Sequence, residues 1–150
     1  GTVFKGYYAD TEATADTLVE GGWLRTGDLA EIDQDGFLFL RDRLKELIKF
    51  KGFQGAPAEV EAALIAHEAI TDAAVIGKPD EAAGEVPIAF VVPADGASLT
   101  PERLAQHVAA CLATFKRPVE YRMVDAVPKS ASGKILRRVL RDQMQAEMAG

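Results

Sequence analysis

The chain has 150 residues, of which 48% are hydrophobic and 27% charged, and its formal net charge is −6 at pH 7. This length can bury one substantial core, and the composition is ordinary for a globular protein. The negative charge argues against nucleic acid or an anionic membrane surface as a partner. The single cysteine, Cys111, excludes an internal disulfide framework and favours a reducing compartment. The sequence has no apolar run of about 18 residues, so we expect no membrane span and a cytoplasmic protein.

The first third of the sequence predicts a short helix followed by two hairpins. Helix signals cover residues 10–18. Strands over 29–33 and 37–40 flank the turn Asp35-Gly36, because Asp-Gly tolerates positive φ. Residues 45–54 alternate charged and apolar side chains, which predicts a second small hairpin.

The rest of the sequence predicts a compact α+β domain. Its helices begin at signals such as Thr100-Pro101, an N-cap followed by a proline in the first turn. We expect Cys111, inside one of these helices, to be buried. In chain order, we predict a helix over 57–66, strands over 73–77 and 87–92, a helix over 101–112, a strand over 119–124 and a helix over 135–148.

Charge is unevenly distributed along the chain. Residues 1–40 hold two Lys or Arg and eight Asp or Glu, whereas residues 41–54 hold five basic and two acidic residues. Residues 129–141 hold five basic residues and no acidic one. Two basic islands on an acidic body favour a discrete, phosphate-rich ligand over a polymer. We place a domain boundary where the acidic hairpin gives way to the basic segment, which divides the chain into residues 1–44 and 45–150.

The most informative stretch is the Ser/Gly-rich loop over residues 128–134, Pro-Lys-Ser-Ala-Ser-Gly-Lys, which ends at Lys134. A basic amphipathic helix is predicted to follow at once. A loop anchored by a helix suits a lysine that is delivered to an anionic substrate for one step and then withdrawn. Taken alone, Lys134 is more simply explained as a solvated turn residue.

Further motifs lie upstream: Gly-Trp-Leu-Arg-Thr-Gly-Asp at 22–28, Asp-Arg-Leu-Lys-Glu-Leu-Ile-Lys-Phe-Lys-Gly-Phe-Gln at 42–54, and Ala-Pro-Ala-Glu at 56–59. Together with Lys134, they resemble the C-terminal part of the adenylate-forming enzymes, which include acyl- and aryl-CoA ligases, luciferases and peptide-synthetase adenylation domains. The resemblance covers nearly the whole chain and is strongest to the coumarate-CoA ligase and luciferase branch.

The resemblance implies an α+β fold in which a small C-terminal domain, with a mixed β-sheet flanked by helices, follows a β-hairpin remnant of a large N-terminal domain. The complete enzyme would use ATP with Mg²⁺ to join a carboxylic acid to AMP, and would then transfer the acyl group to CoA. Mg²⁺ would be bound mainly through ATP and the missing N-terminal domain. Lys45 matches the hinge about which the small domain rotates between the two steps. The chain alone would be inactive.

The resemblance also implies that Asp28 and Arg43 bind the nucleotide. A carboxylate fixed at a turn can accept hydrogen bonds from both hydroxyls of a ribose. The planar guanidinium of Arg43 can add a contact that lysine cannot copy. Without the resemblance, Asp28 could instead cap its own turn. Arg43 could equally form a surface ion pair with Asp42 or Glu46.

Lys49, Lys51 and Gln54 are expected to share one face of the second hairpin. In the family, Lys49 and Gln54 match residues that support catalysis, and Lys51 with Gly52 matches the backbone that contacts CoA. The local alternative is a basic edge that deters strand pairing. The next residue, Gly55, departs from the branched residue typical of the family and could alter the position of Gln54.

Lys134 matches the lysine that bridges the acyl carboxylate and the α-phosphate during adenylation. An ammonium there offsets the repulsion between two anions, and losing such a donor commonly costs about 2–4 kcal/mol. The same loop resembles the motif that lysine acetyltransferases modify, so an acetyltransferase acting on Lys134 is an expected partner. His67 and His107 have no partner at ligand spacing and are interpreted as structural.

Two other functional hypotheses remain open. One keeps adenylation but uses a carrier protein or an oxidative reaction as the second step. The other is a stand-alone, non-catalytic binding module. The acid itself is not specified, although the branch favours an aryl acid over a fatty acid.

Overall fold

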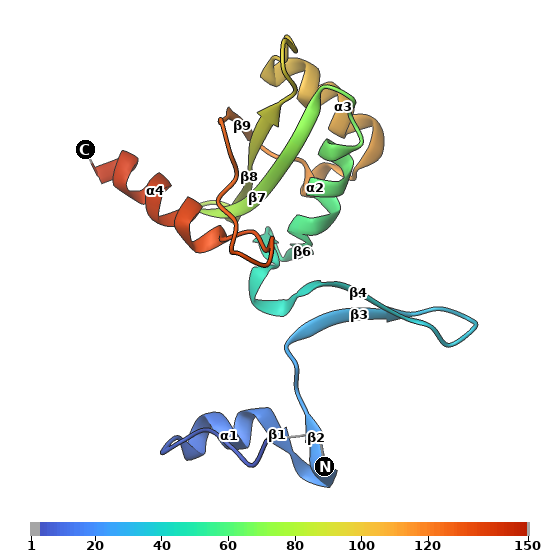
Figure 1. The fold of residues 1–150 in the computed structure, drawn as a ribbon, viewed down its shortest axis with the longest axis vertical. Coiled ribbons are helices and arrows are strands. Elements are labelled where there is room, and N and C mark those ends of the chain that lie inside the picture. The colour runs from blue at the N-terminus through green and yellow to red at the C-terminus, as the bar shows by residue number, and fades with distance from the viewer. Residues whose placement is uncertain (1–3, 150) are drawn as a thin grey trace. The chain divides into compact units, whose positions relative to one another are not determined.

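The computed structural model describes residues 4–149 and divides the chain into two compact units (Figure 1). The first unit ends at Lys45 and the second begins at Glu46.

The first unit is built from short elements: α1 (Thr11–Thr17), β1 (Leu18–Val19), η1 (Glu20–Gly22), β2 (Trp23–Leu24), β3 (Asp28–Ile32) and β4 (Leu38–Arg43). Asp10 caps α1, since its Oδ1 accepts a hydrogen bond of 2.9 Å from the Ala13 N–H. Strands β3 and β4 form the predicted antiparallel hairpin. Its turn is closed by Asp33, whose Oδ1 accepts from the N–H groups of Asp35 and Phe37.

The β3–β4 hairpin exposes apolar side chains on both of its faces. Because successive strand residues point to opposite sides, Leu38 and Leu40 lie on one face and Phe39 on the other. All three are exposed, as are Ile32 and Phe37 beside them. Contiguous exposed apolar surface of this kind marks an interaction site in most proteins.

The second unit contains β5 (Ile48–Phe50), β6 (Phe53–Gly55), α2 (Pro57–Ile65), β7 (Ile70–Asp80), β8 (Gly84–Pro93), α3 (Pro101–Cys111), η3 (Thr114–Lys116), β9 (Glu120–Met123) and α4 (Arg137–Ala149), and a 3₁₀ turn, η2 (Leu44–Glu46), lies at the division between the units. The strand order is β6-β5-β8-β7, with β9 paired to β8. Only the β8–β9 pairing is parallel, so the sheet is mixed, and the α+β prediction is confirmed.

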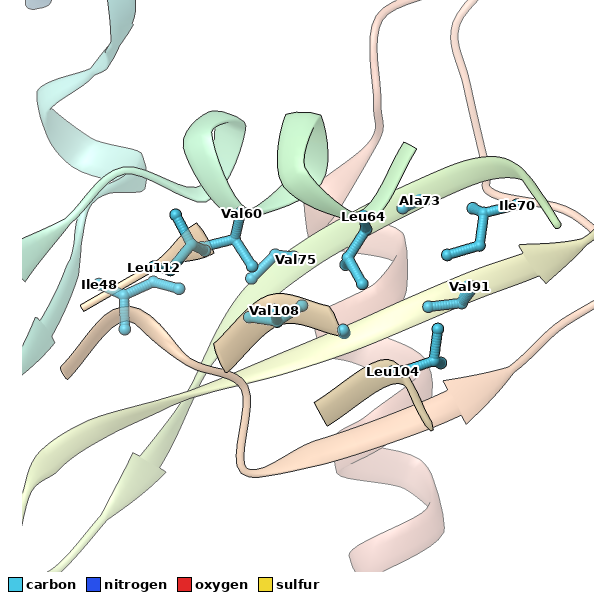
Figure 2. Close-up of a cluster of buried hydrophobic side chains, with 11 residues drawn as sticks. Ile48, Val60, Leu64, Ile70, Ala73, Val75, Val91, Leu104, Val108 and Leu112 are labelled. Atoms are coloured by element: carbon cyan, nitrogen blue, oxygen red, sulfur yellow. The ribbon is translucent and has the colours of Figure 1, made fainter. Parts of the chain in front are cut away.

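Helices cover both faces of this sheet. Alternate residues of β7 point to opposite sides, so Ala73 and Val75 enter one core while Ala74 and Ile76 enter the other. The first core packs the sheet against α2 and α3, and Figure 2 shows their side chains directed toward the strands. The second core packs the sheet against α4. Figure 1 accordingly shows α2 and α4 on different sides of the β7–β8 hairpin.

Three sequence-based expectations are corrected by the structure. Strand β7 extends three residues beyond its predicted limits at both ends, and β8 begins three residues earlier and ends one residue later than predicted, because the two strands form one long hairpin. The final helix begins at Arg137, because Ile135 forms a β-bridge with Lys129. Cys111 is exposed, since the buried face of α3 passes through Leu104 and Val108 instead. No helix in the part of the chain that the structure describes combines the length and apolar character needed to cross a bilayer.

Candidate active-site segments

Asp28 and Arg43 lie directly opposite each other at the open end of the β3–β4 hairpin. The Arg43 Nε is 3.0 Å from Asp28 Oδ1. Hydrogen bonds next to both residues hold the pair in place: the Asp28 N–H donates to Thr26 Oγ1, and the Leu44 N–H donates to the Gly27 carbonyl. Arg43 thus pairs with Asp28, whereas the local alternative was a surface ion pair with Asp42 or Glu46; Glu46 pairs with Arg141 instead. A carboxylate and a guanidinium fixed side by side offer both acceptors and donors to a polar ligand.

Lys45, the predicted hinge, is an exposed residue within η2 at the end of the first unit. Its placement leaves the side chain outside both cores.

Lys49 and Gln54 are brought together by the β5–β6 hairpin, in which they are direct cross-strand partners and so share one face. The Lys49 N–H donates to Glu85 Oε2 at 2.8 Å, which ties β5 to β8. Lys51 lies in the turn and not on the strand face, so the expectation of three residues in one row holds for two of them.

The turn itself is made by Lys51 and Gly52, with φ angles of +47° and +83°. Such angles characterise the two-residue turns that suit hairpins, and glycine adopts them at little cost. Lysine rarely does, and residues held in this region cluster at functional sites. The Lys51 N–H donates to the Ala83 carbonyl at 2.8 Å, which fixes the turn to the rest of the unit.

Lys134 lies at the end of a tightly hydrogen-bonded loop. The Ser130 N–H donates to the Lys134 carbonyl at 2.8 Å, the Lys134 N–H donates to Ser130 Oγ, and the Gly133 N–H donates to the Ser130 carbonyl. The side chain of Lys134 is exposed, and within the described part of the second unit its ammonium has no hydrogen bond or ion pair. The backbone of the loop is therefore ordered while its cation is free to meet an anion.

One end of this loop is fixed to β7 and the other to α2. At one end, Lys129 Nζ is 2.6 Å from Asp72 Oδ2. At the other, Arg137 forms a two-bonded pair with Glu61 of α2, at 2.8 Å to each carboxylate oxygen. Sequence reasoning missed both contacts, since the partners are distant along the chain.

The Arg137–Glu61 pair also forms hydrogen bonds with the backbone of Val75 at the free edge of the sheet. β7 is an outer strand, and its Val75 N–H donates to Glu61 Oε1 at 2.8 Å. The Val75 carbonyl accepts from Arg137 Nε at 3.2 Å. The side chains of Arg137 and Glu61 are only 12% and 9% exposed. A buried pair with its remaining hydrogen-bonding groups satisfied in this way can be stable.

One helical turn beyond Arg137, Arg141 Nη2 donates to Glu46 Oε2 at 2.8 Å. Glu46 is the residue after Lys45, so this pair joins the start of the second unit to α4. A sequence signal for these anchors did exist. Glu61 falls on the apolar stripe of α2 with Pro57, Val60 and Leu64, where an unpaired carboxylate would be costly.

Gly55 is buried in β6, and a Cβ built there would lie 3.8 Å from Lys116 Cγ, an ordinary contact. His67 Nδ1 accepts from the Ala69 N–H, and His107 Nε2 lies 2.8 Å from the Ala63 carbonyl. Both histidines therefore hydrogen-bond to backbone groups around α2, and their rings lie edge to face with centroids 5.0 Å apart. Among residues 4–149, no group of three or more His, Cys, Asp or Glu side chains is arranged to hold a metal ion.

Groups with shifted pKa values lie on α3 and β9 of the second unit. Partial burial raises the pKa of Tyr121. A hydrogen bond to Glu120 raises the pKa of Arg122. Backbone and Thr100 hydrogen bonds lower the pKa of Glu102 at the start of α3. None of these groups belongs to the site segments above.

The family model for the AMP-binding enzyme C-terminal domain matches residues 59–134. The 4-coumarate–CoA ligase CCL1 of Humulus lupulus is 52% identical over 147 residues, which are 98% of this chain and 27% of that protein. The peroxisomal OPC-8:0-CoA ligase 1 of Arabidopsis thaliana is 52% identical over 139 residues, 93% of this chain and 26% of that protein.

Among solved structures, ATP-bound MatB from Rhodopseudomonas palustris superposes with a TM-score of 0.88 at 34% identity, covering 94% of this chain and 28% of that one. The chain thus spans about a quarter of the length of the curated relatives it matches.

Proposed function

Because the chain belongs to the family of AMP-binding enzyme C-terminal domains, we propose that it is the C-terminal quarter of an AMP-forming acid–CoA ligase. The observation that carries the proposal is the ordered loop that presents the free ammonium of Lys134. CoA is favoured as the acyl acceptor over a carrier protein or an oxidative step, since relatives at about 52% identity are named CoA ligases.

The two units correspond to two parts of that enzyme. Residues 1–44 are the end of a large adenylation domain, and residues 45–150 are a mobile small domain that turns about Lys45. The exposed apolar faces of the β3–β4 hairpin support the first assignment, because a larger domain would cover them. The second unit, by contrast, has cores of its own on both sides of its sheet.

In the first step, a carboxylate oxygen of the acid attacks the α-phosphorus of ATP, and the bond to pyrophosphate breaks. Two anions approach each other in this step, and the Lys134 ammonium offsets their repulsion in the transition state. Asp28 accepts hydrogen bonds from the ribose hydroxyls, and Arg43 holds Asp28 in place while offering further donors. Mg²⁺ would be supplied with ATP and would be held by the ATP phosphates and by parts of the enzyme outside this chain.

In the second step, the CoA thiol attacks the acyl carbonyl, its proton is lost to solvent or a base, and AMP leaves. The β5–β6 hairpin serves this step. The turn at Lys51-Gly52 presents backbone to the pantetheine arm, while Lys49 and Gln54 stand together on the adjacent face to orient the adenylate. The small domain therefore offers one segment to each step: the Lys134 loop to the first and the β5–β6 hairpin to the second.

The proposed substrate is an aryl or fatty acid, and the proposed compartment is the cytoplasm, although one relative is named a peroxisomal ligase. Acetylation of Lys134 by a lysine acetyltransferase would remove its charge and block adenylation. The exposure of Lys134 supports access by such an enzyme.

Acid-dependent exchange of radiolabelled pyrophosphate into ATP tests the proposed function. The full-length protein is assayed with a panel of aryl and fatty acids, and the 150-residue chain is assayed in parallel. We expect exchange with the full-length protein and none with the chain alone. Exchange by the chain alone, or no exchange by the full-length protein with any acid, would contradict the proposal.

A further inference from the structure

The helix that follows the Lys134 loop carries two arginines that reach in different directions from one face. Arg137, Leu140, Arg141 and Met144 follow the i, i+3, i+4, i+7 spacing of a single stripe along α4. Leu140 and Met144 are buried in the second core. Arg137 precedes Leu140, and Arg141 lies between Leu140 and Met144, so the stripe combines a hydrophobic attachment with two charged ones.

Each arginine binds a different part of the second unit. Arg137, at the first turn of α4, binds Glu61 of α2 and the Val75 carbonyl of β7. Arg141, one turn later, binds Glu46 at 2.8 Å, and both side chains of this pair are partly buried, at 34% and 19% exposed. The first contact holds the end of the Lys134 loop, and the second holds the beginning of the unit.

From these contacts we infer that Glu46 and Arg141 are positioning residues for Lys134. The inference rests on the proposed function, in which the small domain turns about Lys45. Because Glu46 is bound to α4, backbone rotation has to occur before Glu46. The same bond makes α4 rotate together with Glu46. The Lys134 loop, which ends three residues before Arg137, moves with α4. The pair thus sets where Lys134 arrives when the small domain closes for adenylation.

Loss of the Glu46–Arg141 contact should slow adenylation and leave thioester formation nearly unchanged. Misplacing a catalytic group by about 1 Å can reduce a rate by up to roughly 10²-fold. Arg141→Ala leaves Arg137 and the apolar attachment in place, so we expect a fall of about tenfold in kcat for adenylation. The KM for ATP and for the acid should stay within about twofold, because Lys134 acts in the transition state. Thioester formation from preformed acyl-AMP should change less than about twofold.

Three variants of the full-length enzyme control this test. Arg138→Ala is the matched control, since Arg138 lies on the same helix, is 91% exposed and has only a 3.7 Å ion pair with Asp142. It should keep the wild-type rate. Glu46→Ala should reproduce the effect of Arg141→Ala, and the double variant should be no slower than either single one, because residues that act through one contact are not additive. Additive losses, or equal losses in both half-reactions, would overturn the inference.

A second measurement does not depend on catalysis. Amide hydrogen exchange of the 150-residue chain reports the loop through the bonded N–H groups of Ser130, Gly133 and Leu136. Arg141→Ala should speed exchange at these amides several-fold, and Arg138→Ala should not. Unchanged exchange in Arg141→Ala would refute the coupling. If the wild-type enzyme failed to adenylate any acid, the proposed function would fall, and the exchange result would still decide whether Glu46 and Arg141 hold the loop.

Discussion

Replacing Arg137 with alanine is the sharpest perturbation of the second unit's stability. The substitution removes the partner of a carboxylate whose side chain is only 9% exposed. Glu61 keeps the hydrogen bond from the Val75 N–H, but it loses two charged bonds of 2.8 Å. The Val75 carbonyl loses its donor at the edge of the sheet.

The magnitude follows from these losses. Breaking a buried ion pair by removing one partner destabilises proteins by about 3–5 kcal/mol. The lower end applies here, because the pair retains some exposure and Glu61 keeps the hydrogen bond from the Val75 N–H. We therefore expect the free energy of unfolding to fall by about 3 kcal/mol. For a unit of this size, each 1 kcal/mol lowers Tm by about 4 °C, so Tm should fall by about 12 °C.

Urea unfolding of the 150-residue chain, followed by circular dichroism at 222 nm, measures this change, since three of the four α-helices found among residues 4–149 lie in the second unit. The slope of the unfolding free energy against urea concentration should stay the same, because the substitution changes the stability of the unit and not the compactness of its unfolded state. Arg138→Ala, on the exposed side of the same helix, should cost less than about 0.5 kcal/mol.

A double replacement separates the ion pair from the edge of the strand. In Arg137→Met with Glu61→Leu, no charge is left buried, which alone is often neutral or stabilising. Both backbone groups of Val75 would lose their partners, however, and each costs about 1–3 kcal/mol when buried. The double variant should therefore regain only part of the stability that Arg137→Ala loses. A loss below about 0.5 kcal/mol in Arg137→Ala, or an equal loss in Arg138→Ala, would refute this reasoning.

Three other substitutions have expected outcomes. Gly55→Ala should raise the free energy of unfolding by about 0.5–1 kcal/mol in urea, because its Cβ meets only Lys116 Cγ at 3.8 Å and alanine restricts the unfolded chain; a loss would contradict the room seen there. Lys51→Asn should keep or raise stability by up to about 1 kcal/mol in the same urea titration, because asparagine tolerates positive φ, and a loss of stability would contradict this. Burial raises the pKa of Tyr121, because it favours the neutral phenol. The stability that this burial contributes is therefore present below pH 10 and is lost as pH rises through the folded pKa. Tyr121→Phe should therefore flatten the alkaline part of a stability–pH curve, and an unchanged curve would contradict that.

Local signals were sufficient for many of the elements. Thr100 accepts from the Arg103 N–H and α3 begins at Pro101, as the sequence indicates. Pro57 likewise opens α2. The hairpin turns at Asp35-Gly36 and Lys51-Gly52 were also recognisable, because few residues adopt the backbone angles these turns need. Such features depend on neighbours within a few residues, which a sequence displays directly.

Long-range contacts could not be predicted in the same way. Arg137 meets Glu61 across 76 residues, and Arg141 meets Glu46 across 95. Nothing in the neighbouring residues specifies which acid each arginine selects. The same limit explains Ile135, whose apolar side chain suits a helix but whose backbone pairs with Lys129. The candidate site was recognised through motif order, whereas the contacts that hold it depend on packing between distant elements.

Acid-dependent pyrophosphate exchange by the full-length protein, compared between wild type and Lys134→Ala, tests the central claim most directly. The account predicts that Lys134→Ala slows exchange by roughly 10²–10³-fold while the second half-reaction, started from preformed acyl-AMP, continues at a comparable rate. Exchange by Lys134→Ala at the wild-type rate would contradict the account, because the free cation at the end of the loop would then have no part in adenylation.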